Sequence, residues 1–185
     1  VLAGTALSVV LLALTHMITI NSNEMVFEQY RHWAVGSFQG RGYDVLIPAA
    51  MLIAIGLVIA FSLSKALDTV SLGDDIGHAL GVNPIKIWCF ASIAIVVLAG
   101  TSTAAAGPIS FVGLTAPHIA RMAAGPDHKW LMPFSLLIAS ILAVVADVLG
   151  RIVGYPNEIS VGIMIALIGG PFFVFLVKRW KISLL

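Results

Sequence analysis

The sequence predicts an all-α integral membrane protein, a polytopic helical bundle forming one transmembrane domain over residues 1–185. Of its 185 residues, 59% are hydrophobic and only 10% are charged, and the mean hydropathy is +1.03. An average soluble domain carries about 25% charged residues. The apolar residues fall into runs close to the roughly 20 residues with which a helix crosses a bilayer. The net charge of +1 comes without a basic cluster, which argues against a nucleic-acid surface.

The first apolar run, Val1–Ile20, is long enough to cross about 30 Å of hydrocarbon. No basic segment precedes it, so we interpret it as a membrane span entered partway and not as a signal peptide. We therefore expect the sequence to be the C-terminal part of a longer chain. The polar stretch Asn21–Asp44 follows, with a short helix expected from Glu24. Trp33 and Tyr43 are typical of side chains that lie at a membrane–water interface.

The second span, Val45–Leu63, leads into the polar segment 65–84, KALDTVSLGDDIGHALGVNP. We interpret this segment as two very short helices outside the membrane. Ser71 with Asp74 fits a capping box, and Gly81 suits the C-terminus of a helix. Such a compact segment indicates a surface with a partner, although an ordered connector alone has the same pattern.

Asn83-Pro84 is expected to start the third span, Ile85–Ala106. Gly107-Pro108 then interrupts the chain, and the next apolar piece, Ile109–Ala124, has only 16 residues. As a helix it measures about 24 Å, which is short for a crossing. A broken backbone at membrane depth is tolerated only where it is buried in protein or lines a wet cavity. The single cysteine, Cys89, excludes an internal disulfide and is interpreted as a packing residue.

The last two spans are Leu131–Gly150 and Val161–Val177, and the second is expected to be broken at Gly169-Gly170-Pro171. Basic residues within 178–181 place the C-terminus in the cytoplasm under the positive-inside rule. The charge balance is similar whether or not Ile109–Ala124 crosses. Charge counting therefore leaves the topology open.

Several short motifs occur in order along the chain. They are HWAVGS (His32–Ser37), LGDDIGHALG (Leu72–Gly81), GPISFVGLTAPHIAR (Gly107–Arg121), GPDHK (Gly125–Lys129), Ala146-Asp147 with Arg151, and IGGPFF (Ile168–Phe173). Together they resemble the permease subunit of the FecCD-type ABC importers for iron–siderophores, haem and vitamin B12, over nearly the whole chain. Any one motif alone is a weak signal, whereas their order makes the signal strong.

The resemblance implies a fold of ten expected spans, like that of the vitamin B12 importer permease, of which this chain holds the last six. It implies that Ile109–Ala124 crosses as a short helix enclosed by others. It also implies that segment 65–84 is a cytoplasmic coupling segment that docks on an ATPase subunit. Asn21–Asp44 and Arg151–Ser160 are expected to face a solute-binding protein.

The resemblance also assigns candidate sites. Contact with the ATPase is expected from Leu72, Gly73, Asp74, Asp75, His78, Ala79, Leu80 and Gly81. Docking of the binding protein is expected at Arg151 and Glu158, for which the alternative is a local ion pair. The translocation path is expected beside Thr15, His16 and Met17. Structural motif residues are Gly107, Pro108, Gly113, Pro117, His118, Arg121, Asp147, Gly170 and Pro171.

The implied function is a permease that moves an iron(III)–siderophore complex into the cytoplasm by ATP-driven alternating access, with haem or vitamin B12 as alternative loads. The expected partners are a second permease copy or paralogue, two ATPase subunits that carry ATP and Mg, an extracytoplasmic solute-binding protein and lipid of the bacterial cytoplasmic (inner) membrane. The sequence has no GxxxxGK[ST] phosphate loop, so we expect no enzyme activity and no cofactor on this chain itself. Its five histidines show no ligand spacing, so we expect no metal site.

The main alternative is a proton-coupled secondary transporter in which Asp147, His118 and Arg121 carry protons, since broken helices also suit that class. His118 can instead hydrogen-bond carbonyls freed by Pro117, and Arg121 can reach towards the inner surface. In that alternative, segment 65–84 has no role. A purely structural scaffold leaves the ordered motifs unexplained.

Overall fold

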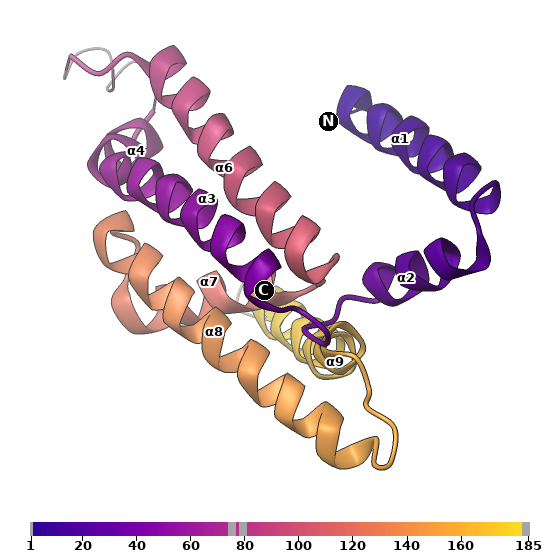
Figure 1. The fold of residues 1–185 in the computed structure, drawn as a ribbon. Coiled ribbons are helices and arrows are strands. Elements are labelled where there is room, and N and C mark those ends of the chain that lie inside the picture. The colour runs from indigo at the N-terminus through magenta and orange to yellow at the C-terminus, as the bar shows by residue number, and fades with distance from the viewer. Residues whose placement is uncertain (1, 74–76, 78–80, 183–185) are drawn as a thin grey trace.

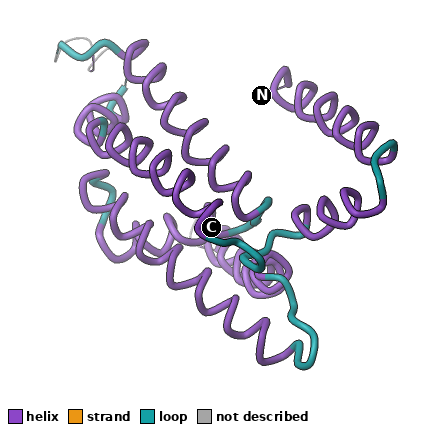
Figure 2. The backbone as a smooth tube through the Cα atoms, in the orientation of Figure 1, coloured by secondary structure: helices purple, strands orange, loops and turns teal. Residues whose placement is uncertain are grey.

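The computed structural model describes the backbone of residues 2–73, 77 and 81–182, and the side chains of these ranges as far as Phe173. The helices are α1 (Leu2–Ile20), α2 (Glu24–Ala34), α3 (Tyr43–Ser62), α4 (Ser64–Ser71), α6 (Pro84–Ala106), α7 (Val112–Ala124), α8 (His128–Val153) and α9 (Val161–Ile182). No strand occurs in the described ranges (Figure 1, Figure 2). The predicted all-α fold is confirmed.

The helices pack as two groups joined by α4. In one group α3 packs along α6, and in the other α7 packs along α8 while α9 contacts both. The short helix α4 lies against both α6 and α8 and connects the groups. Helix α1 has its main contacts with α2, and the two form an arm to one side of α3, α6 and α8 in Figure 1.

One end of the bundle is called here the Arg151 end. It comprises residues 33–42, 103–111 and 150–162. The indole Nε1 of Trp33 donates to the carbonyl oxygen of Thr103 at 3.0 Å. The backbone N–H of Gly162 donates to the carbonyl oxygen of Gly36 at 3.0 Å. The end of α2, the end of α6 and the start of α9 therefore meet at the Arg151 end.

The opposite end is called the Asp68 end. It comprises residues 62–73, 81–87 and 124–131. The carboxylate of Asp68 in α4 accepts the backbone N–H of His128, the first residue of α8, at 3.0 Å. A Cβ added to Gly77 would lie 3.9 Å from the side chains of Val70 and Pro84, so Gly77 lies between α4 and the start of α6.

Helices α3, α6, α7 and α8 each run from one of these ends to the other. For α7 the evidence is that Gly107, just before it, lies against Trp33 and Gly36, whereas His128, just after it, contacts Asp68. If residues 109–124 cross the membrane, as predicted, α7 must run from one end of the bundle to the other, and it does. Contacts between distant parts of the chain thus give α7 a course from one end of the bundle to the other, and its crossing of a membrane stays a prediction.

The predicted start of the short helix at Ile109 is wrong, because α7 begins at Val112 and has 13 residues. That length corresponds to about 20 Å. Phe111 has φ 66, a left-handed conformation that costs roughly 1–2 kcal/mol in a non-glycine residue and cannot extend a right-handed helix. Gly125, with φ 80, ends α7, a position where glycine followed by proline is favoured.

The predicted break in the last span is also wrong, because α9 is continuous and Pro171 lies inside it. A proline in a membrane helix removes one backbone hydrogen bond, and neighbouring helices can satisfy the freed carbonyl. Gly169 serves packing: a Cβ there would lie 2.9 Å from Cβ of Phe111. Gly170 and Pro171 therefore sit within one helix, with no hinge between two half-helices.

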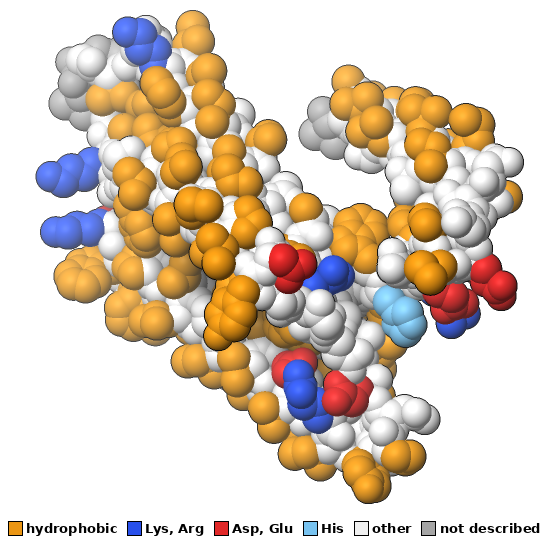
Figure 3. Space-filling view, in the orientation of Figure 1, with side chains coloured by type: hydrophobic (Ala, Val, Ile, Leu, Met, Phe, Trp, Pro, Cys, Tyr) orange, Lys and Arg blue, Asp and Glu red, His pale blue; other side chains and the backbone are white. Residues whose placement is uncertain are grey.

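The outside of the bundle is apolar. Helices α1, α3, α6 and α8 are long and apolar enough to cross a membrane. Side chains such as Ile55, Val96 and Ile141 are more than half exposed, whereas the small buried core lies between α8 and α9 around Ala146 and Val161. Figure 3 shows apolar side chains along the helices and charged side chains gathered towards their ends. A surface of this kind requires lipid or further protein around it, as expected for an integral membrane protein.

Candidate functional site

An ion pair lies at the Arg151 end of α8. Arg151 Nε donates to Asp147 Oδ2 at 2.9 Å, one helical turn away. A guanidinium has five N–H donors, and the contact with Asp147 fixes the plane of the group through one of them. The Arg151 side chain is 52% exposed, so the pair adds little to stability. Asp147, predicted as a structural residue, orients an arginine that remains accessible to a partner.

An open cleft of about 690 Å³ lies beside this ion pair. Its lining residues are Phe38, Gln39, Gly40, Arg41, Gly42, Arg151 and Glu158. The side-chain amide of Gln39 donates to the carboxylate of Glu158, which links the loop before α3 to the loop after α8. The structure therefore brings the two predicted docking residues, Arg151 and Glu158, onto one surface and adds Arg41 to it.

A glycine junction, formed by Gly36, Gly107 and Gly162, holds the elements behind this cleft. A Cβ on Gly107 would lie 2.0 Å from the carbonyl oxygen of Trp33, and one on Gly162 would lie 2.1 Å from the carbonyl oxygen of Val35. These distances are too short for any side chain, so three backbone segments touch directly. The structural role predicted for Gly107 has its physical basis in this contact.

Trp33, predicted as an interfacial anchor, also joins two helices. Its indole N–H points to the carbonyl oxygens of Thr103 and Ala104, at 3.0 and 3.3 Å, and so pins α2 to the end of α6. The backbone N–H of Ser37 reinforces this link by donating to the carbonyl oxygen of Ala106 at 2.8 Å. The HWAVGS motif was the signal for this role, but only the fold shows what the motif contacts.

At the Asp68 end, the described part of segment 65–84 combines exposed residues at 71–73 and 81 with buried ones at 70, 77 and 84. Leu72 is 63% exposed, and Gly73 and Gly81 have φ values of 115° and 77°. The N–H of Gly77 donates to the carbonyl oxygen of Gly73, and that of Val82 donates to Gly77, both at 3.0 Å. The other predicted ATPase-contacting residues, Asp74, Asp75, His78, Ala79 and Leu80, lie outside the described residues. Leu72, Gly73 and Gly81 do share one exposed surface region.

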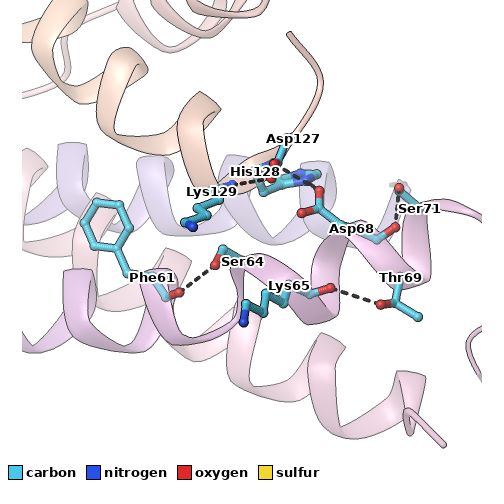
Figure 4. Close-up of polar contacts among 9 residues, drawn as sticks. All are labelled: Phe61, Ser64, Lys65, Asp68, Thr69, Ser71, Asp127, His128 and Lys129. Carbon is cyan, nitrogen blue, oxygen red and sulfur yellow. Dashed lines mark hydrogen bonds and ion pairs between the residues drawn. The ribbon is translucent and has the colours of Figure 1, made fainter. Parts of the chain in front are cut away.

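Asp68 links this segment to α8, as Figure 4 shows. Its Oδ1 atom accepts the backbone N–H of His128 at 3.0 Å and lies 2.5 Å from Nδ1 of the same residue. Asp127 caps the same helix by accepting the N–H of Lys129 at 2.9 Å. The first turn of α8 therefore has one carboxylate from its own chain neighbour and one from α4. No motif in the sequence marks Asp68.

The contact with His128 also changes the protonation of Asp68. Partial burial raises the pKa of Asp68, but hydrogen bonds from His128 and Asp127 and the attraction of the His128 ring outweigh burial and hold this pKa below its usual value. Because the folded-state pKa is depressed, the stabilisation is present above the unfolded pKa, near 3.8, and is lost as the pH falls through the folded value. At neutral pH Asp68 is an ionised acceptor.

The three residues predicted to border the translocation path lie on α1. The hydroxyl of Thr15 donates a hydrogen bond to the carbonyl oxygen of Leu11 in the same helix. His16 and Met17 are exposed. The ring of His16 lies edge-on to that of Tyr30 in α2, with centroids 6.2 Å apart. Most of the surface of α1 is uncovered, so their assignment to a path stays a prediction.

The residues of the proton-relay alternative are spread along the bundle. Arg121 is exposed in the last turn of α7, towards the Asp68 end, whereas Asp147 is paired with Arg151 at the other end. His118 is half-buried in the middle of α7, after Pro117, and Gly113 is exposed in its first turn. The structure therefore does not bring Arg121 and Asp147 into one site.

Two further observations concern ligands. A cavity of about 150 Å³ lies between α7, α8 and α9, lined mostly by apolar side chains with Thr115 among them. Pockets for small-molecule ligands measure about 300–1,000 Å³, so this cavity is too small for a large chelate. Within residues 2–73, 77 and 81–173, no three His, Cys, Asp or Glu side chains are placed to hold a metal ion.

Comparison with known proteins identifies relatives of the whole sequence. The chain is 40% identical over 178 residues to the ferric enterobactin transport system permease protein FepD of Escherichia coli (strain K12), and 33% identical over 180 residues to the hemin transport system permease protein HmuU of Yersinia pestis. These matches cover 96% and 97% of this chain but 53% and 54% of the relatives. The chain thus spans about half the length of the curated relatives it matches, in their C-terminal part.

The fold has a solved counterpart. An ABC transporter described as of the metal-chelate type, in an inward-facing conformation, matches with a TM-score of 0.87 and 30% sequence identity. The match covers 96% of this chain and 59% of that chain. The sequence also matches the FecCD transport family over residues 1–179, so the ordered motifs, the helical bundle and the matched length agree. This chain belongs to the FecCD transport family.

Proposed function

We propose that the chain forms part of the permease subunit of a binding-protein-dependent ABC importer. The observation that carries the proposal is the placement of two exposed candidate sites at opposite ends of one apolar bundle. The cleft with Arg151 and Glu158 lies at one end, and the exposed residues Leu72, Gly73 and Gly81 of segment 65–84 lie at the other. A protein that binds one partner on each side of a membrane needs this arrangement.

The Arg151 end is assigned to the extracytoplasmic solute-binding protein, and the Asp68 end to the cytoplasmic ATPase subunits, which carry ATP and Mg. The C-terminus then lies in the cytoplasm of a bacterium, and the domain 1–185 contains segment 65–84 as its coupling segment. A second permease copy or paralogue completes the pathway. Transport results from a shift between two conformations of the helical bundle. ATP binding stabilises one conformation, and delivery of the substrate stabilises the other. The chain itself performs no chemistry.

The substrate proposed is an iron(III)–siderophore complex. The relatives FepD and HmuU are named for ferric enterobactin and hemin, so haem is a second candidate within the same function. The cavity between α7, α8 and α9 is too small to hold either compound. The translocation path of the substrate therefore runs along another surface of the bundle. We propose that α1, through Thr15, His16 and Met17, borders this path.

Reconstituted uptake tests the function. The full-length permease, assembled with its ATPase in proteoliposomes, receives binding protein loaded with ferric siderophore, haem or vitamin B12. We expect the ferric siderophore to cross into the compartment that contains the ATPase subunits, and only when that compartment contains ATP. Accumulation driven by a proton gradient without ATP would overturn the proposal in favour of the secondary transporter.

Arg151→Glu is expected to weaken docking of the binding protein about tenfold, because it turns an accessible cation into an anion beside Asp147 and Glu158. The loss should shrink in about 1 M salt, where the Debye length falls to about 3 Å. Titration of the permease with labelled binding protein measures it. Lys129→Glu, an equal charge reversal at the Asp68 end, is the control and should leave docking unchanged. Equal affinities for Arg151→Glu and wild type would place the docking surface elsewhere.

A further inference from the structure

Helix α8 connects the two candidate sites. It has 26 residues, about 39 Å, and begins at His128 and ends at Val153. Its first residue contacts Asp68, and its last turns carry Asp147 and Arg151 beside the cleft. No other described helix has polar contacts to segment 65–84 at one end and to the cleft at the other. Movement at either site can reach the other through a single rigid element.

The contact at the Asp68 end is built to hold α8 firmly. One carboxylate oxygen of Asp68 meets both the backbone N–H and the ring of His128, and both side chains are partly buried, at 35% and 25% exposure. The first N–H groups of a helix have no partner within it, and the positive end of the helix dipole favours an anion there. Asp68 therefore acts as a cap supplied by another helix, and breaking it leaves α8 with its own cap, Asp127.

The hydroxyl-bearing side chains around Asp68 bond within α4 or to the residues just before it, whereas Asp68 bonds to α8. The side-chain hydroxyls of Ser64, Thr69 and Ser71 bond to carbonyls of α4 itself or of the residues just before it, as Figure 4 shows. Within the described residues, the long-range side-chain hydrogen bonds of α4 are those that Asp68 accepts from His128. α4 also packs on α6 and α8, but its long-range side-chain hydrogen bonds to α8 pass through the Asp68 carboxylate.

We propose that Asp68 is a positioning residue that ties segment 65–84 to α8, so that a displacement made by the ATPase moves α8 and reaches the binding-protein cleft. The proposal rests on the proposed function. It assigns to Asp68 no contact with substrate or nucleotide. Loss of this residue is expected to uncouple the two activities. The ATPase subunits still hydrolyse ATP, but less substrate is transported for each ATP hydrolysed.

The decisive quantity is the amount of substrate taken up per ATP hydrolysed, measured in proteoliposomes with full-length permease, ATPase and loaded binding protein. We expect Asp68→Ala to lower this ratio about tenfold, as the loss of one charge-assisted hydrogen bond implies. A variant that merely folds or assembles poorly lowers uptake and hydrolysis together and leaves the ratio unchanged. Asp68→Asn should retain more of the ratio, since its amide oxygen still accepts the His128 N–H. Thr69→Ala, one residue along α4, is the matched control and should equal wild type.

A double-mutant cycle and a distance measurement complete the test. If the two residues act together, Asp68→Ala with His128→Ala should be no worse than Asp68→Ala alone. With Cys89 and any other cysteine of the full-length chain replaced by serine, spin labels at Leu72 and Trp130, both exposed, should keep their separation when ATP is added, whereas labels at Leu72 and Val96 should not. A wild-type ratio in Asp68→Ala, or a changed Leu72–Trp130 distance, would overturn the inference. Wild-type uptake that needs no ATP would instead overturn the proposed function.

Discussion

Gly107→Ala is expected to prevent the permease from folding stably. A Cβ at this position would lie 2.0 Å from the carbonyl oxygen of Trp33 and 3.0 Å from Cα of Gly36, and φ of Gly107 is +80. The clash involves backbone atoms, which no side-chain rotation relieves. Strain at such a site places the loss at the upper end of the usual range of about 0.5–3 kcal/mol, or beyond it. The loss of stability is measured by heating the detergent-solubilised complex and recording, by size-exclusion chromatography, how much folded complex remains at each temperature.

The matched control is Gly100→Ala in the same helix. A Cβ at Gly100 meets nothing within 4 Å, and the residue lies inside α6. Alanine favours a helix over glycine by about 0.5–1 kcal/mol, so this variant should be as stable as wild type or slightly more so. If Gly107→Ala also matched wild type, the direct contact between the three backbone segments would not exist in the membrane.

Under the proposed function, Gly81→Pro is expected to abolish ATP-driven uptake while the proposed permease dimer still assembles. Gly81 has φ +77, and proline is fixed near −65, so the turn before α6 cannot form. That turn returns segment 65–84 to the start of α6 through the hydrogen bond from Val82 N–H to the Gly77 carbonyl. The contacts at the Arg151 end of the bundle do not involve this turn. Uptake in proteoliposomes and chromatography of the solubilised dimer separate the two effects.

Gly81→Asn is the control for this variant, because asparagine tolerates positive φ better than other side chains. Nothing lies within 4 Å of a Cβ added at Gly81, so there is room for the side chain. We expect Gly81→Asn to retain most of the uptake. Normal uptake by Gly81→Pro would show that the shape of segment 65–84 is not needed for coupling.

Helix positions were largely predictable because the bilayer imposes a simple length rule. Runs of about 20 apolar residues located α1, α3, α6 and α8, and Gly-Pro pairs located the ends of α6 and α7. The same local rules failed where tertiary contacts decide. Phe111, in a left-handed conformation, delays α7 to Val112, and Gly169 packs on Phe111 inside an unbroken α9.

The candidate sites were predictable only in part. The motifs identified Arg151, Glu158 and the exposed glycines of segment 65–84, because these side chains and turns are encoded locally. Asp68 carried no signal, since a lone aspartate in a short helix resembles any solvated residue. Its partner, His128, lies 60 residues away in the sequence and meets Asp68 only in the folded chain.

The sequence by itself determined that this chain enters a membrane, where its spans lie and which family its motifs resemble, because hydropathy and motif order are properties of the chain. Only the tertiary structure decided that the short helix α7 runs between the two ends of the bundle, that backbone meets backbone at Gly36, Gly107 and Gly162, and that α8 joins the two candidate sites. Those features depend on contacts between distant residues, which composition and spacing do not record.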